Sequence, residues 1–250
     1  MNESRQKLDL PPDAMPKHIA VVMDGNGRWA QQRGKDRTFG HAKGAEAVLP
    51  IVTECANLGL RALSLYALSH ENLIRRPAHE VNCLMDLYEQ YLQSERRKLI
   101  DNRLRFIHIG RREGLATGVL RELDRTTEVT RGNPGLTLAL ALNYGSRQEI
   151  TDAVRAIAAE VAAGKLSPDQ IDEQRISDHL YTAGLPDPDL MIRTAGEMRL
   201  SNFLLWQISY GELWVTPDFW PDFTIGHLHQ ALRDYAGRTR RFGAVVTKTK

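Results

Sequence analysis

A glycine loop headed by an acidic residue, DGNGRWA at residues 24–30, has the residue types and spacing of an anion site. Glycines let the backbone approach an anion closely, and a helix that begins after them presents unpaired N–H groups to it. The carboxylate of Asp24 would repel a diphosphate unless a divalent cation lay between them, and Mg²⁺ bridges carboxylates to substrate phosphates in this way. The loop therefore predicts a Mg²⁺–diphosphate site. The structural alternative is a tight turn in which Asp24 caps the following helix.

The same loop satisfies a looser pattern, because Gly25, Gly27 and Ala30 match the dinucleotide-binding fingerprint GxGxxA. That fingerprint expects an acidic residue about 20 residues later, at the end of the second strand. Here the second expected strand ends near Ser69, which is far too late. A nicotinamide-dependent dehydrogenase is therefore the disfavoured interpretation.

A second polar cluster, SHENLIRRP at residues 69–77, combines hydroxyl, carboxylate, amide and guanidinium groups where a strand ends. A Ser-His-Asp triad is not indicated, since Ser69 and His70 point to opposite faces in strand geometry and no GxSxG elbow surrounds Ser69. Taken alone, the segment is typical of a solvated loop before a helix that begins at Pro77.

A third cluster, IRTAGEMRLSNFLLWQ at residues 192–207, contains three good phosphate ligands in Arg193, Arg199 and Ser201. The apolar run FLLW beside them suits a hydrophobic substrate, although a place in the core is the more usual reason for such a run. Glu212 follows at the head of the next expected strand and is a candidate acid near this site.

Alternating strands and helices have to position these clusters. The apolar runs predict strands at 18–24, 61–69, 103–110, 136–144, 189–194 and 212–216, and helices at 41–58, 78–100, 113–131, 146–163, 167–180 and 224–241. Repeated strand–helix units indicate a single α/β domain with a mostly parallel six-stranded sheet flanked by helices on both faces. The three clusters follow strands, and ligands of such sheets bind at the carboxyl ends. We therefore expect one site.

The composition is that of an ordinary globular protein, with 42% hydrophobic and 26% charged residues. The formal net charge of +2 predicts no nucleic-acid partner, so any anion site must be local. Cys55 and Cys83 have no metal spacing and are expected to be reduced core thiols of a cytoplasmic protein. The N-terminus has no apolar signal-peptide core, and no apolar run reaches the length of a membrane span, so membrane contact would be peripheral.

Six segments together resemble the cis-prenyltransferases, and most closely the bacterial branch that makes undecaprenyl diphosphate. They are HIAVVMDGNGRWA (18–30), RTFGHAKG (37–44), LYALSHEN (65–72), LTLALALNYG (136–145), IRTAGEMRLSNFLLWQ (192–207) and ELWVTPDFWPDF (212–223). The resemblance implies a catalytic domain over 18–243, between a flexible N-terminal arm at 1–17 and a C-terminal tail at 244–250. It also implies a homodimer and a hydrophobic tunnel beneath the active site, with the helix at 78–100 as part of its wall.

The activity implied is the condensation of isopentenyl diphosphate onto an allylic diphosphate such as farnesyl diphosphate, with Mg²⁺ as cofactor. A long product such as undecaprenyl diphosphate would be the precursor of a lipid carrier for cell-wall synthesis, and peripheral membrane contact would serve its release. By motif match, Asp24 and Glu212 would hold the metal, and Asp24, Ser69, Asn72 and Arg75 would act in catalysis. The substrate-binding residues implied are Gly25, Asn26, Gly27, Arg28, Trp29, Arg37 and His41 on the allylic side, and Arg193, Arg199 and Ser201 on the isopentenyl side. The segment 240–243 would reach the partner subunit.

Several positions depart from the family pattern. Leu73 stands where the family usually has Trp, the loop through Arg75 and Pro77 is one residue longer, and Ala195 and Met198 replace a usual Gly or Ser and a frequent His. Ala67 is small where some short-chain members are bulky, which favours a long tunnel. The alternatives are a relative with a short or branched product and a non-catalytic partner subunit. The second is disfavoured because the catalytic Asp and the phosphate-binding arginines are present.

Overall fold

The structure is a computed structural model that describes residue 4 and residues 8–239. Its centre is one six-stranded sheet in the order β3-β4-β2-β1-β5-β6, and every neighbouring pair is parallel. The strands are β1 (His18–Val22), β2 (Ala62–Ser69), β3 (Arg105–Ile109), β4 (Thr137–Tyr144), β5 (Leu190–Arg193) and β6 (Glu212–Val215). The prediction of a six-stranded parallel α/β domain is confirmed.

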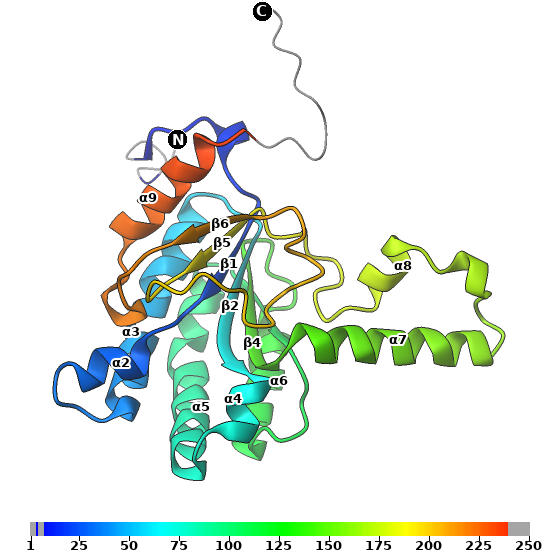
Figure 1. The fold of residues 1–250 in the computed structure, drawn as a ribbon, viewed down its shortest axis with the longest axis horizontal. Coiled ribbons are helices and arrows are strands. Elements are labelled where there is room, and N and C mark those ends of the chain that lie inside the picture. The colour runs from blue at the N-terminus through cyan, green and yellow to red at the C-terminus, as the bar shows by residue number, and fades with distance from the viewer. Residues whose placement is uncertain (1–3, 5–7, 240–250) are drawn as a thin grey trace, which may run out of the picture.

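Helices and short 3-10 turns connect the strands (Figure 1). The α-helices are α2 (Asn26–Gln31), α3 (Arg37–Asn57), α4 (His70–Arg75), α5 (Ala78–Asp101), α6 (Thr117–Thr130), α7 (Ser146–Ala162), α8 (Glu173–Asp178) and α9 (Ile225–Ala236). The 3-10 turns are η1 (Pro12–Ala14), η2 (Pro168–Gln170) and η3 (Trp220–Asp222). Among the described residues, no helix is both long and apolar enough to cross a membrane.

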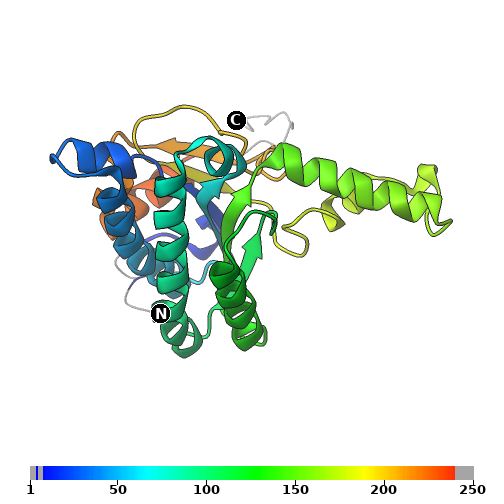
Figure 2. The same ribbon diagram turned by 90° about the horizontal axis from the view of Figure 1, so that it is seen from below.

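The two faces of the sheet are covered differently. On one face α3, α5, α6 and α9 bury the larger core, to which α5 contributes Leu84, Met85, Leu92 and Leu99 at helical spacing. The smaller core on the other face is formed by strand residues and by the non-helical segments before and after β5, with Phe203 completely buried against Tyr66 and Tyr144, so the expectation of helices on both faces was wrong. α7 and α8 project from this body as an arm (Figures 1 and 2).

Some expected elements differ in the structure. The polar loop predicted at 70–77 is mostly helix α4, because Ser69 caps it by accepting a hydrogen bond from the Asn72 backbone at 3.0 Å. The single helix predicted at 167–180 is the short pair η2 and α8. Cys55 is buried as predicted, but Cys83 is exposed on α5, so its assignment to the core was wrong.

The described part of the predicted N-terminal arm packs on the domain. Leu8 is 2% exposed within the larger core, and Ser4 donates a hydrogen bond to Glu54. The predicted tail at 244–250 and the segment 240–243 lie outside the described residues.

Candidate active site

Asp24 lies just after the carboxyl end of β1, and its backbone is held by residues that follow β5 and β6. Its backbone N–H donates to Thr194 Oγ1 at 2.9 Å, and its carbonyl accepts from the Thr194 hydroxyl and from the Trp220 N–H. The carboxylate accepts hydrogen bonds from Arg193 Nη2 at 2.9 Å and from the Gly25 N–H at 2.7 Å, and lies 3.2 Å from Arg28 Nη2. The residue that caps α2 is Gly25, so the alternative in which Asp24 is the helix cap is wrong.

The surroundings of Asp24 keep it ionised. Burial by itself raises its pKa, but the hydrogen bond and charge of Arg193, the charge of Arg28 and the Gly25 N–H together hold the pKa below its ordinary value. The carboxylate therefore stays negative at neutral pH while still 28% exposed to the cleft.

The two glycines of the loop allow close contacts. Gly25 has φ +98°, and a Cβ there would come within 2.4 Å of the Phe219 ring. A Cβ on Gly27 would lie 2.6 Å from Arg37 Cζ, so this glycine lets the guanidinium pack directly on the loop.

Arg193 is the buried cation of the site, with 5% of its surface exposed. Its Nη2 donates to Asp24, while its Nη1 donates to Ser201 Oγ at 2.8 Å and to the backbone carbonyl of Arg199. The segment after β5, which brings Ser201 to Arg193, contains residues in the left-handed region, since Ala195 has φ +72° and Ser201 has φ +51°. A position such as Ala195 favours glycine, which gives a physical reason for the residue usual in the family.

Glu197 joins two arginines that the sequence assigns to different diphosphates. Its carboxylate accepts from Arg28 Nη1 at 3.0 Å and from Arg199 Nη1. The guanidinium groups of Arg28 and Arg199 are thus paired with the same carboxylate. Arg28, Arg193 and Arg199 are three cations gathered at one strand end.

Two arginines and a histidine surround Glu80, which is 5% exposed on α5. Its carboxylate lies 2.9 Å from Arg76 Nη1, 3.2 Å from His41 Nε2 and 3.4 Å from Arg37 Nε. Burial lowers the pKa of His41, and the charge of Arg76 lowers it further. Sequence reasoning missed Glu80 and Arg76, because only the packing of α3 against α4 and α5 brings these side chains together.

The end of β2 supplies Ser69 and Asn72 to the cleft, as predicted, but not Arg75. Helix α4 ends at Arg75, whose side chain is exposed, and Arg76 is extended with ψ 152°, which turns it back toward Glu80. The structure therefore places Arg76, the residue next to Pro77, where Arg75 was predicted.

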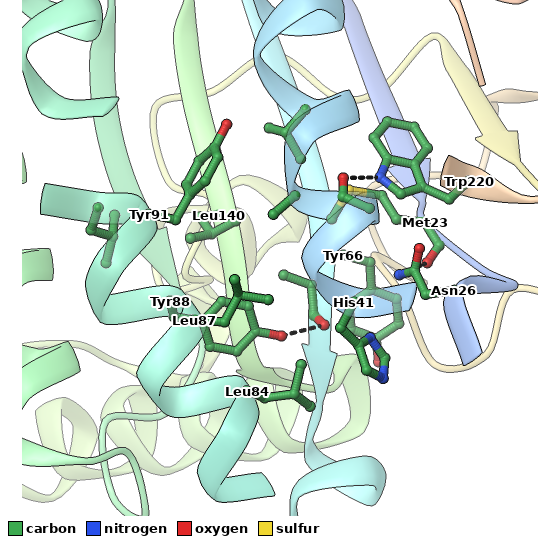
Figure 3. A pocket seen from close by; sticks show the side chains of 15 residues that line it. Met23, Asn26, His41, Tyr66, Leu84, Leu87, Tyr88, Tyr91, Leu140 and Trp220 are labelled. Atoms are coloured by element: carbon green, nitrogen blue, oxygen red, sulfur yellow. Dashed lines mark hydrogen bonds between the residues drawn. The ribbon is translucent and has the colours of Figure 1, made fainter. Parts of the chain in front are cut away.

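A cleft of about 530 Å³ connects these groups at the carboxyl ends of the strands. Eight predicted site residues line this cleft: Asp24, Asn26, His41, Ser69, Asn72, Arg193, Arg199 and Ser201. Tyr66, Glu71, Arg76 and Asn202, which the prediction did not single out, also line it. The cleft continues inward as an apolar cavity of about 70 Å³ between the sheet and helices α3 and α5 (Figure 3). Tyr66 and Ala67 line both spaces.

Besides Arg75, two other predicted site residues, Trp29 and Glu212, lie away from this cleft. Trp29 stacks on Phe39, lies under Arg33 and lines a separate groove with Pro50 and Pro221, because it faces outward from α2. Glu212 begins β6, beside Leu190 at the start of β5, and donors on Arg238 contact it at 2.7 Å. The starts of parallel strands lie at the opposite edge of the sheet from Asp24, so one chain does not bring Glu212 and Asp24 together.

The donor set suits a metal held mainly by substrate. No group of three or more His, Cys, Asp or Glu side chains suited to a metal occurs among residue 4 and residues 8–239. Asp24 nevertheless presents a partly exposed, ionised carboxylate to the cleft. Mg²⁺ usually binds one or two carboxylates and completes its shell with phosphate oxygens and water, so this set fits Mg²⁺ brought in with a diphosphate.

Known proteins are similar to this chain in sequence and fold. The family model described as "Putative undecaprenyl diphosphate synthase" matches residues 22–243. An isoprenyl transferase of Heliobacterium mobile is 50% identical over 98% of this chain and 94% of its own length, and one of Geobacter sulfurreducens is 48% identical over 94% and 95%.

Two solved structures extend the similarity. Lavandulyl diphosphate synthase from Lavandula x intermedia, in complex with dimethylallyl diphosphate, superposes with a TM-score of 0.90 at 38% identity and covers 92% of this chain and 99% of its own. A "probable undecaprenyl diphosphate synthase" from Campylobacter jejuni gives 0.74 at 31% identity, over 91% of this chain and 98% of its own. The chain therefore belongs to the cis-prenyltransferase family of isoprenyl transferases.

Proposed function

We propose that this chain condenses isopentenyl diphosphate repeatedly onto an allylic diphosphate, with farnesyl diphosphate as primer and a long product such as undecaprenyl diphosphate. The observation that carries the proposal is that an arginine-lined cleft and an apolar cavity lie next to each other and share the lining residues Tyr66 and Ala67. Diphosphates match the guanidinium groups of the cleft, and a hydrocarbon chain matches the apolar walls beyond it.

Different residues of the cleft bind the two diphosphate substrates. Arg193, Arg199 and Ser201 bind isopentenyl diphosphate, while the glycine loop with Arg28, Arg37 and His41 holds the allylic diphosphate. This holds the two reacting carbons together and removes much of the entropic barrier. The allylic C–O bond breaks and its electron pair leaves with the diphosphate, whose growing charge the arginines stabilise.

The new C–C bond then forms to the terminal alkene carbon of isopentenyl diphosphate, and a proton leaves from its C2 to a diphosphate oxygen. Ser69 and Asn72 lie in the cleft beside Arg76 and assist this proton removal. Bound Mg²⁺ would supply positive charge to the departing diphosphate, with Asp24 as its protein ligand. Glu212 has no part in this single-chain arrangement.

A second candidate is a relative with a short or branched product. It is favoured by the small volume of the apolar cavity, about 70 Å³, and by the similarity to a lavandulyl diphosphate synthase. Both candidates use the same diphosphate site and differ in what the cavity accepts.

We further propose a cytoplasmic homodimer that touches the membrane only peripherally to release product for cell-wall synthesis. The catalytic domain would span 18–243. Support for the dimer comes from the family resemblance alone.

The test is to incubate the purified chain with Mg²⁺, labelled isopentenyl diphosphate and, in turn, dimethylallyl, geranyl or farnesyl diphosphate, and to size the products. A ladder of long products from farnesyl diphosphate supports the first candidate, and one short or branched product supports the second. Absence of incorporation with every primer would refute both and favour a non-catalytic partner subunit.

A further inference from the structure

The apolar space beyond the cleft consists of two chambers in series. The upper chamber, of about 70 Å³, opens to the cleft at Tyr66 and Ala67. A lower chamber of about 20 Å³ lies farther along α5 and is lined by Leu99 and Phe106, among others. Four residues line both chambers: Val48, Tyr91, Leu92 and Leu140. These residues form the partition between them.

Tyr91 is the only aromatic side chain of this partition. Figure 3 shows its ring beside Leu140, with the hydroxyl pointing away from Tyr88 and from His41 at the cleft. Burial raises the pKa of Tyr91, and the charge of Glu95, one helical turn further along α5, raises it more. Glu95 also lines the lower chamber, so the Tyr91 ring extends from the upper chamber toward the lower one.

Tyr91 is also less completely buried than two of its partners. Val48 and Leu92 are 8% and 3% exposed and belong to the core, whereas Tyr91 is only partly buried and packs against that core. Displacing Val48 or Leu92 would open cavities elsewhere in a close-packed interior. Displacing the Tyr91 ring would disturb less of the core packing than displacing Val48 or Leu92.

The volumes show why a partition matters. A cavity of about 150 Å³ is enough to hold a benzene molecule, and about 10–15 Å³ is enough for one water. By these measures the upper chamber, at about 70 Å³, is small even for one five-carbon unit, and the lower one, at about 20 Å³, holds little more than a water molecule. A chain that grows beyond the upper chamber must therefore push part of the wall aside.

We propose that Tyr91 determines product length by separating the two chambers, so that the growing hydrocarbon stops at this ring or passes it only when the ring moves. The inference rests on the proposed elongation activity. It assigns the length of the product to the side chain at the partition rather than to the floor of the lower chamber.

The product test compares four single variants and one double variant with the unaltered chain. Tyr91→Ala joins the chambers and shifts the main product upward by at least one isoprene unit, while Tyr91→Phe keeps the ring and leaves the product ladder unchanged. Tyr91→Trp shifts it downward. Phe106→Leu, which enlarges only the lower chamber, has no effect alone but lengthens products further in the Tyr91→Ala background. Melting temperatures establish that each variant is folded.

A binding test needs no turnover. Calorimetry with geranyl, farnesyl and geranylgeranyl monophosphates measures how affinity increases with chain length. In the unaltered chain the increase stops where the hydrocarbon meets Tyr91, and in Tyr91→Ala it continues to longer ligands. If Tyr91→Ala leaves this dependence unchanged, or if Phe106→Leu alone lengthens it, the inference is wrong. An unaltered chain that shows this binding pattern but incorporates no isopentenyl diphosphate would refute the proposed function instead.

Discussion

Replacing Asp24 by Asn tests the centre of the proposed site. The carboxylate accepts hydrogen bonds on both oxygens, from Arg193 at 2.9 Å and from the Gly25 N–H at 2.7 Å. An amide can face only one of these donors with its oxygen and turns its own N–H groups toward the other. The substitution therefore removes one charge-assisted bond and leaves a donor unpaired.

The stability cost follows from these contacts. A hydrogen bond to a charged group contributes about 1.5–3 kcal/mol. Because the Asp24 side chain is 28% exposed, water replaces part of the lost interaction, and we expect the lower end of that range. For a chain of 250 residues this lowers the melting temperature by about 3–6 °C. A mere helix cap would show almost no change, since Asn caps as well as Asp.

The contribution of Asp24 to the free energy of unfolding depends on pH in a direction that its pKa determines. Because the pKa of Asp24 is lower in the folded protein than its ordinary 3.8, the ionised carboxylate stabilises the fold at neutral pH. That contribution is lost as the pH falls below 3.8 and through the lower folded value. The difference in unfolding free energy between the unaltered chain and the Asp24→Asn variant should thus be constant above about pH 5, roughly one pH unit above the ordinary pKa. In acid this difference should shrink.

The catalytic effect should be much larger than the effect on stability. Asn lacks the negative charge that would hold Mg²⁺, so we expect kcat to fall by on the order of 10²–10³-fold, the typical loss when one electrostatic group is removed. Urea unfolding and steady-state kinetics measure the two quantities. Asp222→Asn, at an exposed pair with Arg33, is the matched control and should cost less than about 1 kcal/mol without loss of activity. Near-normal kcat in a folded Asp24→Asn protein would remove Asp24 from the mechanism.

Three further predictions concern the metal, the diphosphate site and the tunnel, and a fourth separates two adjacent arginines. Excess EDTA should abolish turnover and added Mg²⁺ should restore it, and full activity in EDTA would contradict a metal-dependent step. Arg199→Ala should raise KM for isopentenyl diphosphate far more than KM for the primer, by about 10-fold or more if a bond of about 1.5–3 kcal/mol is lost; equal increases would count against the assignment. Ala67→Phe, at the mouth of the apolar cavity, should shorten the products without preventing the first condensation, as product sizing would measure. Arg76→Ala should impair turnover while Arg75→Ala leaves it nearly unchanged, and the reverse result in paired assays would assign the role to Arg75.

The local sequence determined the elements and the main polar cluster. Continuous apolar runs such as 18–24 and 136–144 are typical of strands buried on both faces, and the parallel sheet that they form places the residues after each strand at one edge. Asp24, Ser69 and Arg193 could therefore be grouped from the sequence alone. The same rule separates Glu212 from them, because this residue stands at the head of its strand, which in a parallel sheet lies at the far edge.

Only the tertiary structure decided which neighbouring side chains face the cleft. Arg75 and Arg76 are adjacent and chemically identical, and the choice between them depends on where α4 ends and on the buried Glu80 that holds Arg76. Trp29 follows the glycine loop directly, yet the turn of α2 directs it outward. The two apolar cavities that share Tyr91 are lined by residues of α3, α5 and β4, which are distant in sequence. A pattern along the chain specifies local conformation, whereas the facing of a side chain into a shared cavity depends on packing between elements that meet only in the folded protein.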